Sequence, residues 1–297
     1  MSTSGFRPQS VAEVLARGII MLAKHSDSPR TDAQLLLASV LGRDRAWLIA
    51  HGDSFISRPQ SERFSELCEK RATGVPIPYI LGTALFYGRE FVVNDKVLVP
   101  RPESELLVED AVAYLRGRLD PAYPKQLLTV LDVGTGSGAI ACSLAAEIAA
   151  VTVEGIDTSL AALKVAEHNA RRFNIFAKCK FRFGDLALGM GERHFDAVVA
   201  NLPYLPTAAI PPSPDPLSFE PREALDGGPD GLSLYRRLLP ALPALLKPGA
   251  LVLLEAAPPT MDGLAALAAQ AFPDDELQIV RDLAGLERYV RILTARG

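Results

Sequence analysis

The residues whose types and spacing point most directly to ligand chemistry lie in a glycine-rich segment, LDVGTGSGAIA, between an apolar run and a helix-like stretch. Glycine allows positive φ angles and a close approach of the backbone to a ligand, and the helix after such a turn presents free N–H groups. We therefore expect a cofactor-binding loop formed by Gly134, Thr135, Gly136, Ser137 and Gly138.

Two classes of cofactor fit this loop. Its spacing satisfies the GxGxxG/A dinucleotide fingerprint, and Asp157 follows Gly134 near the distance expected of a ribose-binding acid. Asp132 and Asp185, however, bring carboxylates toward the loop, where they would repel a pyrophosphate and attract a ligand with an ammonium and a sulfonium group. S-adenosylmethionine (SAM) is such a ligand. We expect Asp157 to bind its ribose hydroxyls, and Asp185 and Leu186 to meet its adenine.

A tetrapeptide with acceptor groups follows the apolar run FDAVVA. Asn201 offers a side-chain carbonyl and Leu202 a backbone carbonyl. Pro203 stiffens the turn and Tyr204 adds an aromatic face. A planar NH₂ group bound here would donate both hydrogens and present its nitrogen to a methyl group. Because the lone pair of that nitrogen is delocalised, fixed acceptors and alignment would supply much of the catalysis. We expect these four residues to be catalytic, with Asn201 also touching the cofactor.

These segments belong to a part of the chain, after residue 102, in which short apolar runs alternate with helical stretches. An expected helix from Glu103 to about Leu119 precedes the first of these runs. Such alternation is typical of a mostly parallel sheet covered by helices on both faces. The fold class is therefore α/β, with ligands expected at the carboxyl ends of the strands. The expected strands are Leu127–Val133, Val151–Ile156, Cys179–Phe183, Phe195–Ala200, Ala250–Glu255, Leu277–Val280 and Arg288–Leu293.

The region before residue 75 has helical periodicity throughout, so we expect a small helical bundle without strands. Ser10 and Glu13 have capping-box spacing, and Thr31 or Asp32 is expected to cap the next helix.

The next segment, up to residue 100, is rich in β-branched and aromatic residues, which predicts a β-hairpin. The expected division of the chain is therefore 1–77, a helical domain; 78–100, a hairpin connector; and 101–297, the α/β domain. Within the last, Pro203–Pro221 forms a long proline-rich loop, which is usually functional.

Composition narrows the classes of function. Thirty-one basic and 35 acidic residues give a net charge of −4, and 48% of the chain is hydrophobic, as in a globular protein. A pI near 5.7 argues against a large basic surface for nucleic acid. The three cysteines show no CxxC spacing and the four histidines no HExxH pattern, so we propose no metal. The first residues lack the features of a signal peptide, and we expect a cytoplasmic protein.

Longer motifs show a resemblance over nearly the whole chain to the release-factor glutamine N5-methyltransferases, the PrmC/HemK family. The family's hallmark is an NPPY tetrapeptide. The matching segments are Asp32-Ala33 with Leu35-Leu36, GVPIPYILG, LVPRPESE, DVGTGSGAIA, FEPREALDGGPDGL, LLEAA and DLAGLERYV.

This resemblance implies a class I SAM-dependent methyltransferase fold, with a Rossmann-like, mostly parallel seven-stranded sheet behind a helical N-terminal domain. It implies that 134–138, Asp157, Leu186 and Asn201 bind SAM and that 201–204 bind a glutamine. The implied activity is methylation of the side-chain amide nitrogen of the glutamine in the Gly-Gly-Gln loop of peptide chain release factors. Because one amide offers few contacts, we expect residues 1–77 to recognise the protein substrate.

The sequence departs from the family pattern at three positions. Leu202 replaces the first proline of NPPY, although any residue supplies the backbone carbonyl needed there. Leu186 stands where relatives often have an aromatic residue. Glu255-Ala256-Ala257 replaces the Glu-Ile-Gly sequence that the family has after the fifth strand. These changes are expected to adjust loop rigidity or cofactor affinity rather than the reaction.

Other functions stay open. A closely related alternative is a glutamine methyltransferase that acts on a ribosomal protein. An N6-adenine methyltransferase would use the same acceptors, but the negative net charge and the absence of a basic cluster around Asn201 argue against a polyanionic substrate. An NAD-binding oxidoreductase leaves the tetrapeptide unexplained. A non-catalytic SAM-binding protein would result if Leu202 has spoiled the site.

Overall fold

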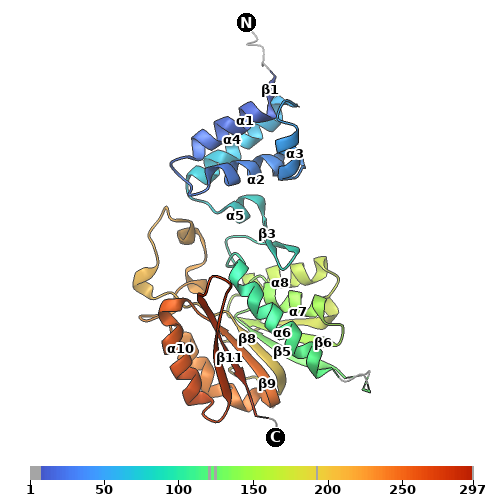
Figure 1. Ribbon diagram of the computed structural model, residues 1–297, viewed down its shortest axis with the longest axis vertical. Helices are drawn as coiled ribbons and strands as arrows, with labels where there is room; N and C mark the ends of the chain where they lie inside the picture. Colours follow the sequence, from blue (N-terminus) through green and yellow to red (C-terminus); the bar gives the residue numbers. More distant parts are fainter. Residues whose placement is uncertain (1–7, 120–121, 124–125, 192, 296–297) are drawn as a thin grey trace. The chain divides into compact units, whose positions relative to one another are not determined.

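The computed structural model describes residues 8–119, 122–123, 126–191 and 193–295, which fall into two compact units (Figure 1). The helical unit comprises the described residues up to 82 together with 212–219, and the sheet unit comprises the remainder. Each unit has its own hydrophobic core. No helix in the described part of the chain is both long and apolar enough to cross a membrane.

The helical unit confirms the predicted bundle. Its core is formed by apolar side chains such as Val14, Leu36 and Phe64. At the start of the first helix, Ser10 Oγ accepts a hydrogen bond from the Glu13 backbone N–H, and Glu13 Oε2 accepts one from the Ser10 N–H at 2.8 Å, which confirms the capping box. The helices are α1 (Val11–Leu22), α2 (Pro29–Leu41), α3 (Arg45–Ala50), α4 (Arg58–Ala72) and α5 (Ile77–Leu81).

Two local predictions in this unit are wrong. Helix α2 begins at Pro29, with Ser28 as its N-cap, so neither Thr31 nor Asp32 caps it. Asp32 is instead buried in the first turn of the helix, where its carboxylate accepts a hydrogen bond at 2.7 Å from the Arg71 guanidinium. The unit also contains a short antiparallel pair of two-residue strands, β1 (Gln9–Ser10) and β2 (Phe55–Ile56). Strands this short leave no periodicity to detect.

The sheet unit confirms the α/β prediction. Its seven strands lie in the order β10-β11-β9-β8-β5-β6-β7, parallel from β9 to β7, while β11 runs antiparallel to both of its neighbours. The expected strands are all present, and eight of their fourteen ends agree with the structure, while the others are shifted by one to four residues. The strands are β5 (Leu128–Val133), β6 (Val151–Asp157), β7 (Cys179–Phe183), β8 (Phe195–Ala200), β9 (Leu246–Glu255), β10 (Glu276–Arg281) and β11 (Glu287–Leu293).

Helices cover both faces of this sheet. Val130 packs into the core formed with α6, α7 and α8, whereas the next residue, Leu131, packs into the opposite core with α9 and α10. The helix expected from Glu103 starts as a 3₁₀ turn, η1, before α6. The bounds are η1 (Pro102–Ser104), α6 (Glu105–Arg118), α7 (Ala139–Glu147), α8 (Leu160–Arg172), α9 (Ser233–Leu238) and α10 (Pro258–Ala271).

The predicted hairpin is present as β3 (Thr83–Phe86) and β4 (Arg89–Val92), but it belongs to the sheet unit rather than forming a separate connector. The Asn169 side chain on α8 accepts from the Val92 N–H at 2.8 Å and donates to the Val92 carbonyl at 3.0 Å. Phe91 packs edge-on against Phe173, with ring centroids 4.8 Å apart. These contacts fix the hairpin to α8, while residues 78–81, expected in the connector, lie in α5.

The proline-rich loop contains two 3₁₀ turns, η3 (Thr207–Ala209) and η4 (Pro216–Phe219), and a cis Ser213–Pro214 bond. Its residues 212–219 group with the helical unit. There, a Cβ atom at Gly74, whose φ is +98°, would come within 2.2 Å of the Pro214 carbonyl oxygen. Only glycine allows this close approach.

Candidate active site

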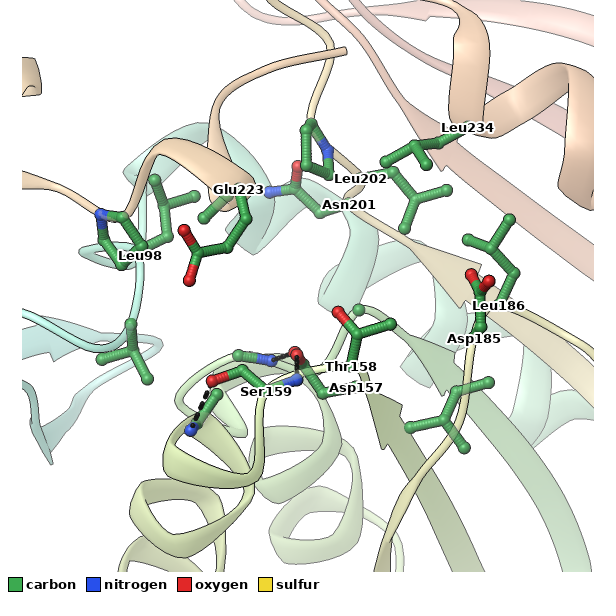
Figure 2. A pocket seen from close by; sticks show the side chains of 18 of the residues that line it. Leu98, Asp157, Thr158, Ser159, Asp185, Leu186, Asn201, Leu202, Glu223 and Leu234 are labelled. Carbon is green, nitrogen blue, oxygen red and sulfur yellow. Dashed lines mark hydrogen bonds between the residues drawn. The ribbon is translucent and has the colours of Figure 1, made fainter. Parts of the chain in front are cut away.

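A pocket of about 770 Å³, counting the space at its mouth, opens at the carboxyl ends of β5, β6 and β8 (Figure 2). The pocket brings together eight of the predicted site residues: Gly134, Gly136, Asp157, Asp185, Leu186, Asn201, Leu202 and Pro203. Its other lining residues include Leu98, Ser159, Glu223 and Leu234, which the sequence patterns did not single out.

The glycine loop has the backbone geometry that its sequence predicts. Gly134, Gly136 and Gly138 have φ angles of +75°, +55° and +76°. A Cβ atom at Gly134 would lie 2.9 Å from Leu202 Cδ2, and one at Gly138 would lie 3.0 Å from Ala166 Cβ, whereas one at Gly136 would meet only the Gly134 carbonyl oxygen, at 4.0 Å. The loop therefore needs glycine for close packing at its two ends and leaves its centre open to a ligand.

Thr135 and Ser137 do not line the pocket and instead hold the loop from below. The Thr135 hydroxyl donates to Asp132 Oδ2 at 2.7 Å, and the Ser137 carbonyl accepts from the Asn169 side chain at 2.9 Å. Both residues are buried. Their proposed contribution to cofactor binding is thus to shape the loop, with Gly138 packed against α8.

Asp132 lies beneath the loop and not among the pocket-lining residues. Its Oδ2 also accepts from the Ala141 N–H at 3.2 Å, which ties the loop to the start of α7. Its Oδ1 is buried with no hydrogen-bond partner among the described residues, and burial raises the pKa of the carboxyl to about 7. The expectation that Asp132 attracts a charged ligand directly does not match this placement, since its contacts stabilise the loop.

Asp157, the last residue of β6, lines the pocket. Its Oδ2 accepts from the Gly136 N–H at 2.9 Å and its Oδ1 from the Ser159 N–H at 2.8 Å. Burial raises the pKa of the carboxyl, and the charge of Glu223 raises it further. Figure 2 shows the Glu223 side chain pointing into the cavity toward Asp157 and Ser159. A carboxylate in this position has lone pairs for the hydroxyls of a diol.

Asp185 and Leu186 form the wall after β7. The Leu186 side chain is buried against the apolar core beneath the pocket, and its φ of +55° is unusual for a residue with a side chain. Together with Leu234 it offers an apolar surface to a flat ring. The Asp185 carboxylate pairs with Arg237 at 2.5 Å and is half exposed.

The tetrapeptide 201–204 follows β8, as predicted. Asn201 Nδ2 donates to Ser104 Oγ at 2.8 Å, so its Oδ1 is the half of the amide left to accept from a ligand. The Leu202 side chain is buried against Gly134 and fills the place behind the loop. Tyr204 does not line the pocket. Its hydroxyl donates to Glu255 Oε1 at 3.4 Å, and burial raises its pKa.

Sequence reasoning gave no role to two polar groups beneath the tetrapeptide. Ser104 reaches Asn201 from η1, and Glu255, the last residue of β9, lies below Tyr204. Glu255 is only 2% exposed. An ionisable residue at the end of a strand as apolar as LVLLE was the available signal, because buried carboxylates are rare without a specific partner.

Comparison with known proteins gives matches in both units. Residues 13–82 match the family model of the PrmC N-terminal domain, and residues 111–210 match that of the methyltransferase small domain. The release factor glutamine methyltransferase of Moorella thermoacetica is 38% identical over 280 residues, which is 94% of this chain and 95% of that protein. The protein of the same name from Bordetella pertussis is 38% identical over 88% of this chain and 93% of its own.

Among solved structures, a methyltransferase from Pyrococcus furiosus superimposes with a TM-score of 0.50 and 16% identity, over 70% of this chain and 90% of that one. This likeness concerns the fold alone.

Proposed function

Since the chain belongs to the family of release factor glutamine methyltransferases, we propose that it transfers a methyl group from SAM to the side-chain amide nitrogen of the glutamine in the Gly-Gly-Gln loop of peptide chain release factors. The observation that carries the proposal is the position of Asn201. It lines the same pocket as the glycine loop and Asp157, so the amide that receives the methyl group and the cofactor would meet there.

The residues of the pocket fit SAM, which supplies an electrophilic methyl group on its sulfonium. The centre of the loop at Gly136 leaves room for a close approach, and Asp157, which lines the pocket, would accept from the ribose hydroxyls. Leu186 would pack on the adenine, with Asp185 at its edge. The two carboxylates of Asp157 and Glu223 favour a cationic cofactor over a dinucleotide, whose pyrophosphate they would repel.

Catalysis rests on acceptors and alignment. Asn201 Oδ1 and the Leu202 carbonyl accept one N–H each from the glutamine amide, which places its nitrogen in line with the methyl group. Transfer of the methyl group from the sulfonium would leave S-adenosylhomocysteine and place positive charge on that nitrogen, which the two oxygens would stabilise. The nitrogen would then give its proton to solvent water, which restores the neutral amide. Tyr204 and Pro203 shape the site around the amide.

The decisive experiment identifies the methylated atom. Purified protein is incubated with methyl-labelled SAM and a panel of release factors and ribosomal proteins, and the product is mapped by fragmentation mass spectrometry. Label on the Gly-Gly-Gln glutamine, absent when that glutamine is changed to alanine, supports the proposal. Label confined to a ribosomal protein or to nucleic acid would contradict it.

The remaining features of the proposal concern partners and place. With a net charge of −4 the protein is expected to have no stable nucleic-acid partner, and its partners are the release factors themselves. We place it in the cytoplasm, where translation termination provides this substrate.

Asp157→Ala should weaken SAM binding. The change removes hydrogen bonds to the ribose, each worth on the order of 1.5 to 3 kcal/mol when charge-assisted, and frees the Gly136 N–H that the carboxylate holds. Calorimetry measures the affinity. The matched control is Glu154→Ala on the same strand, whose carboxylate pairs with Arg182 and Arg193 away from the pocket. Equal SAM affinity in Asp157→Ala and the parent, or binding of NADH instead, would show that the cofactor is wrongly assigned.

Leu202→Pro should change kcat by no more than about threefold, because the backbone carbonyl at this position is kept. The proline removes only a 3.4 Å hydrogen bond from the Leu202 N–H to the Tyr235 hydroxyl and part of the packing on Gly134. Steady-state kinetics on a release factor provide the measurement. A loss as large as that of Asn201→Ala would mean that the leucine side chain has become necessary.

A further inference from the structure

A buried set of polar groups lies beneath the tetrapeptide and joins three separate parts of the sheet unit. Asn201 follows β8, Ser104 belongs to η1 and Glu255 ends β9. Ser104 and Glu255 are 3% and 2% exposed, so both are shielded from bulk water. Neither lines the pocket, which means that any influence they have on the reaction must pass through Asn201 or Tyr204.

The orientation of the Asn201 amide depends on Ser104. An asparagine amide can turn by 180° and exchange its donor and acceptor ends. In this structure Nδ2 donates to Ser104 Oγ at 2.8 Å. If the amide turned over, an NH₂ group would face the NH₂ group of the glutamine substrate, and the two donors would repel each other.

Glu255 belongs to the same buried set as Ser104. Tyr204 donates to Glu255 Oε1 at 3.4 Å, and the nearby Ser104 hydroxyl lowers the pKa of Glu255 against the effect of burial. Glu255 Oε2 is buried and has no hydrogen-bond partner among the described residues, and such an orphaned oxygen needs explanation. An ionised carboxylate only accepts, so a Ser104 hydroxyl hydrogen turned to this oxygen would give it a donor and leave the Ser104 lone pairs to Asn201.

We infer that Ser104 and Glu255 are positioning residues. Ser104 holds the Asn201 amide by its hydrogen bond, with the amide nitrogen turned inward and the oxygen facing the substrate amide, and Glu255 sets the direction of the Ser104 hydroxyl. The inference rests on the proposed function, since it assigns no chemistry of its own to either residue. It explains why a carboxylate stands at the end of an apolar strand, directly below the tetrapeptide.

The direction in which the Ser104 hydroxyl donates its hydrogen bond should depend on pH. Burial, together with the charge of Glu103, raises the pKa of Glu255 to about 7 against the opposing effects of Ser104, Tyr204 and Arg288. The Tyr235 hydroxyl from α9 donates to the Glu255 backbone carbonyl, and burial raises its own pKa, so it stays neutral. As the pH falls through about 7, Glu255 gains a proton and can donate to Ser104. The Asn201 amide then loses its fixed direction, so kcat should fall on the acid side.

The test compares pairs of variants that differ only in hydrogen bonding. Ser104→Val should lower kcat about 10- to 100-fold, and Ser104→Thr, which has nearly the same shape but keeps a hydroxyl, should recover most of that loss. The affinity for SAM, measured by calorimetry, should change by less than about twofold in both. The control is Ser143→Ala, which removes another buried serine hydroxyl that lies outside this buried set. It should leave kcat unchanged.

Glu255→Gln provides the second, independent measurement. The amide can donate to Ser104 at every pH, so kcat should be lower by a similar factor and should lose the acid-side fall near pH 7. Because a raised pKa means that the ionised carboxyl destabilises the fold above its unfolded pKa, the variant should melt no lower than the parent at pH 8. A residue with a purely structural role would instead lower the melting temperature and leave the pH profile alone.

The outcomes separate this inference from the proposed function. If the parent fails to methylate any release factor, the proposed function is wrong. If the parent is active but Ser104→Val equals Ser104→Thr in kcat, or Glu255→Gln keeps the acid-side fall of the parent, the positioning role is overturned. Should Ser104→Val fail to bind SAM or to fold, the pH profile of Glu255→Gln decides alone.

Discussion

Asn201→Ala is expected to lower kcat by about 10²- to 10³-fold, the loss that follows when one preorganised group is taken from a developing charge. Alanine keeps the backbone but removes Oδ1, one of the two oxygens proposed to stabilise the positive nitrogen of the glutamine. The other oxygen, the Leu202 carbonyl, stays. Because the interaction strengthens as the methyl group is transferred, the loss should appear in kcat more than in KM.

Single-turnover kinetics on a release factor and calorimetry with SAM provide the two measurements. SAM affinity should stay within about threefold of the parent, since the proposed work of the side chain is on the amide. A parallel collapse of SAM binding would mean that Asn201 mainly holds the cofactor. Unchanged turnover would remove the tetrapeptide from the mechanism.

Much of the sheet unit could be predicted because its signals are local. Parallel strands buried on both faces appear as continuous apolar runs, and those ending at Val133, Ala200 and Glu255 end at the same residues in the structure. The glycine loop was predictable for the same reason, since turn, glycine spacing and following helix lie within one short segment. Strand ends of a parallel sheet meet at one edge, so the meeting of Gly136, Asp157 and Asn201 followed from the fold class.

Roles that depend on distant partners were not predictable. Asp132 stands beside the glycines in sequence, but it ends in the sheet interior under Thr135, where it stabilises the loop. Asp32 has the type and position of a helix cap, yet Arg71, from another helix, takes its carboxylate. Ser104 and Asn201 are 97 residues apart, and only the packing of η1 against the end of β8 brings them together. For Asp32 and Ser104 a long-range contact decides between two uses of the same side chain, whereas for Asp132 the contacts are local and its burial in the sheet decides.

Removing residues 1–82 should lower kcat/KM for an intact release factor by at least about 100-fold, equivalent to roughly 2.7 kcal/mol of lost transition-state binding. Every proposed cofactor and acceptor group belongs to the sheet unit, so the helical unit adds no chemistry. A glutamine side chain alone offers too few contacts to be told from the many others in the cell. The remaining specificity must come from surface remote from the amide, and the helical unit is the part of the chain free to provide it.

The substrate itself provides the matched control for this truncation. A short peptide that carries the Gly-Gly-Gln sequence is too small to reach a remote surface, so its kcat/KM should be the same with the full chain and with residues 83–297. Circular dichroism and SAM calorimetry show whether the truncated protein is folded, which its separate hydrophobic cores lead us to expect. If the peptide and the intact factor lose activity by the same factor, the helical unit supports the catalytic site rather than recognition. If neither loses activity, recognition lies within residues 83–297, because only a surface that the truncation keeps could then distinguish the factor.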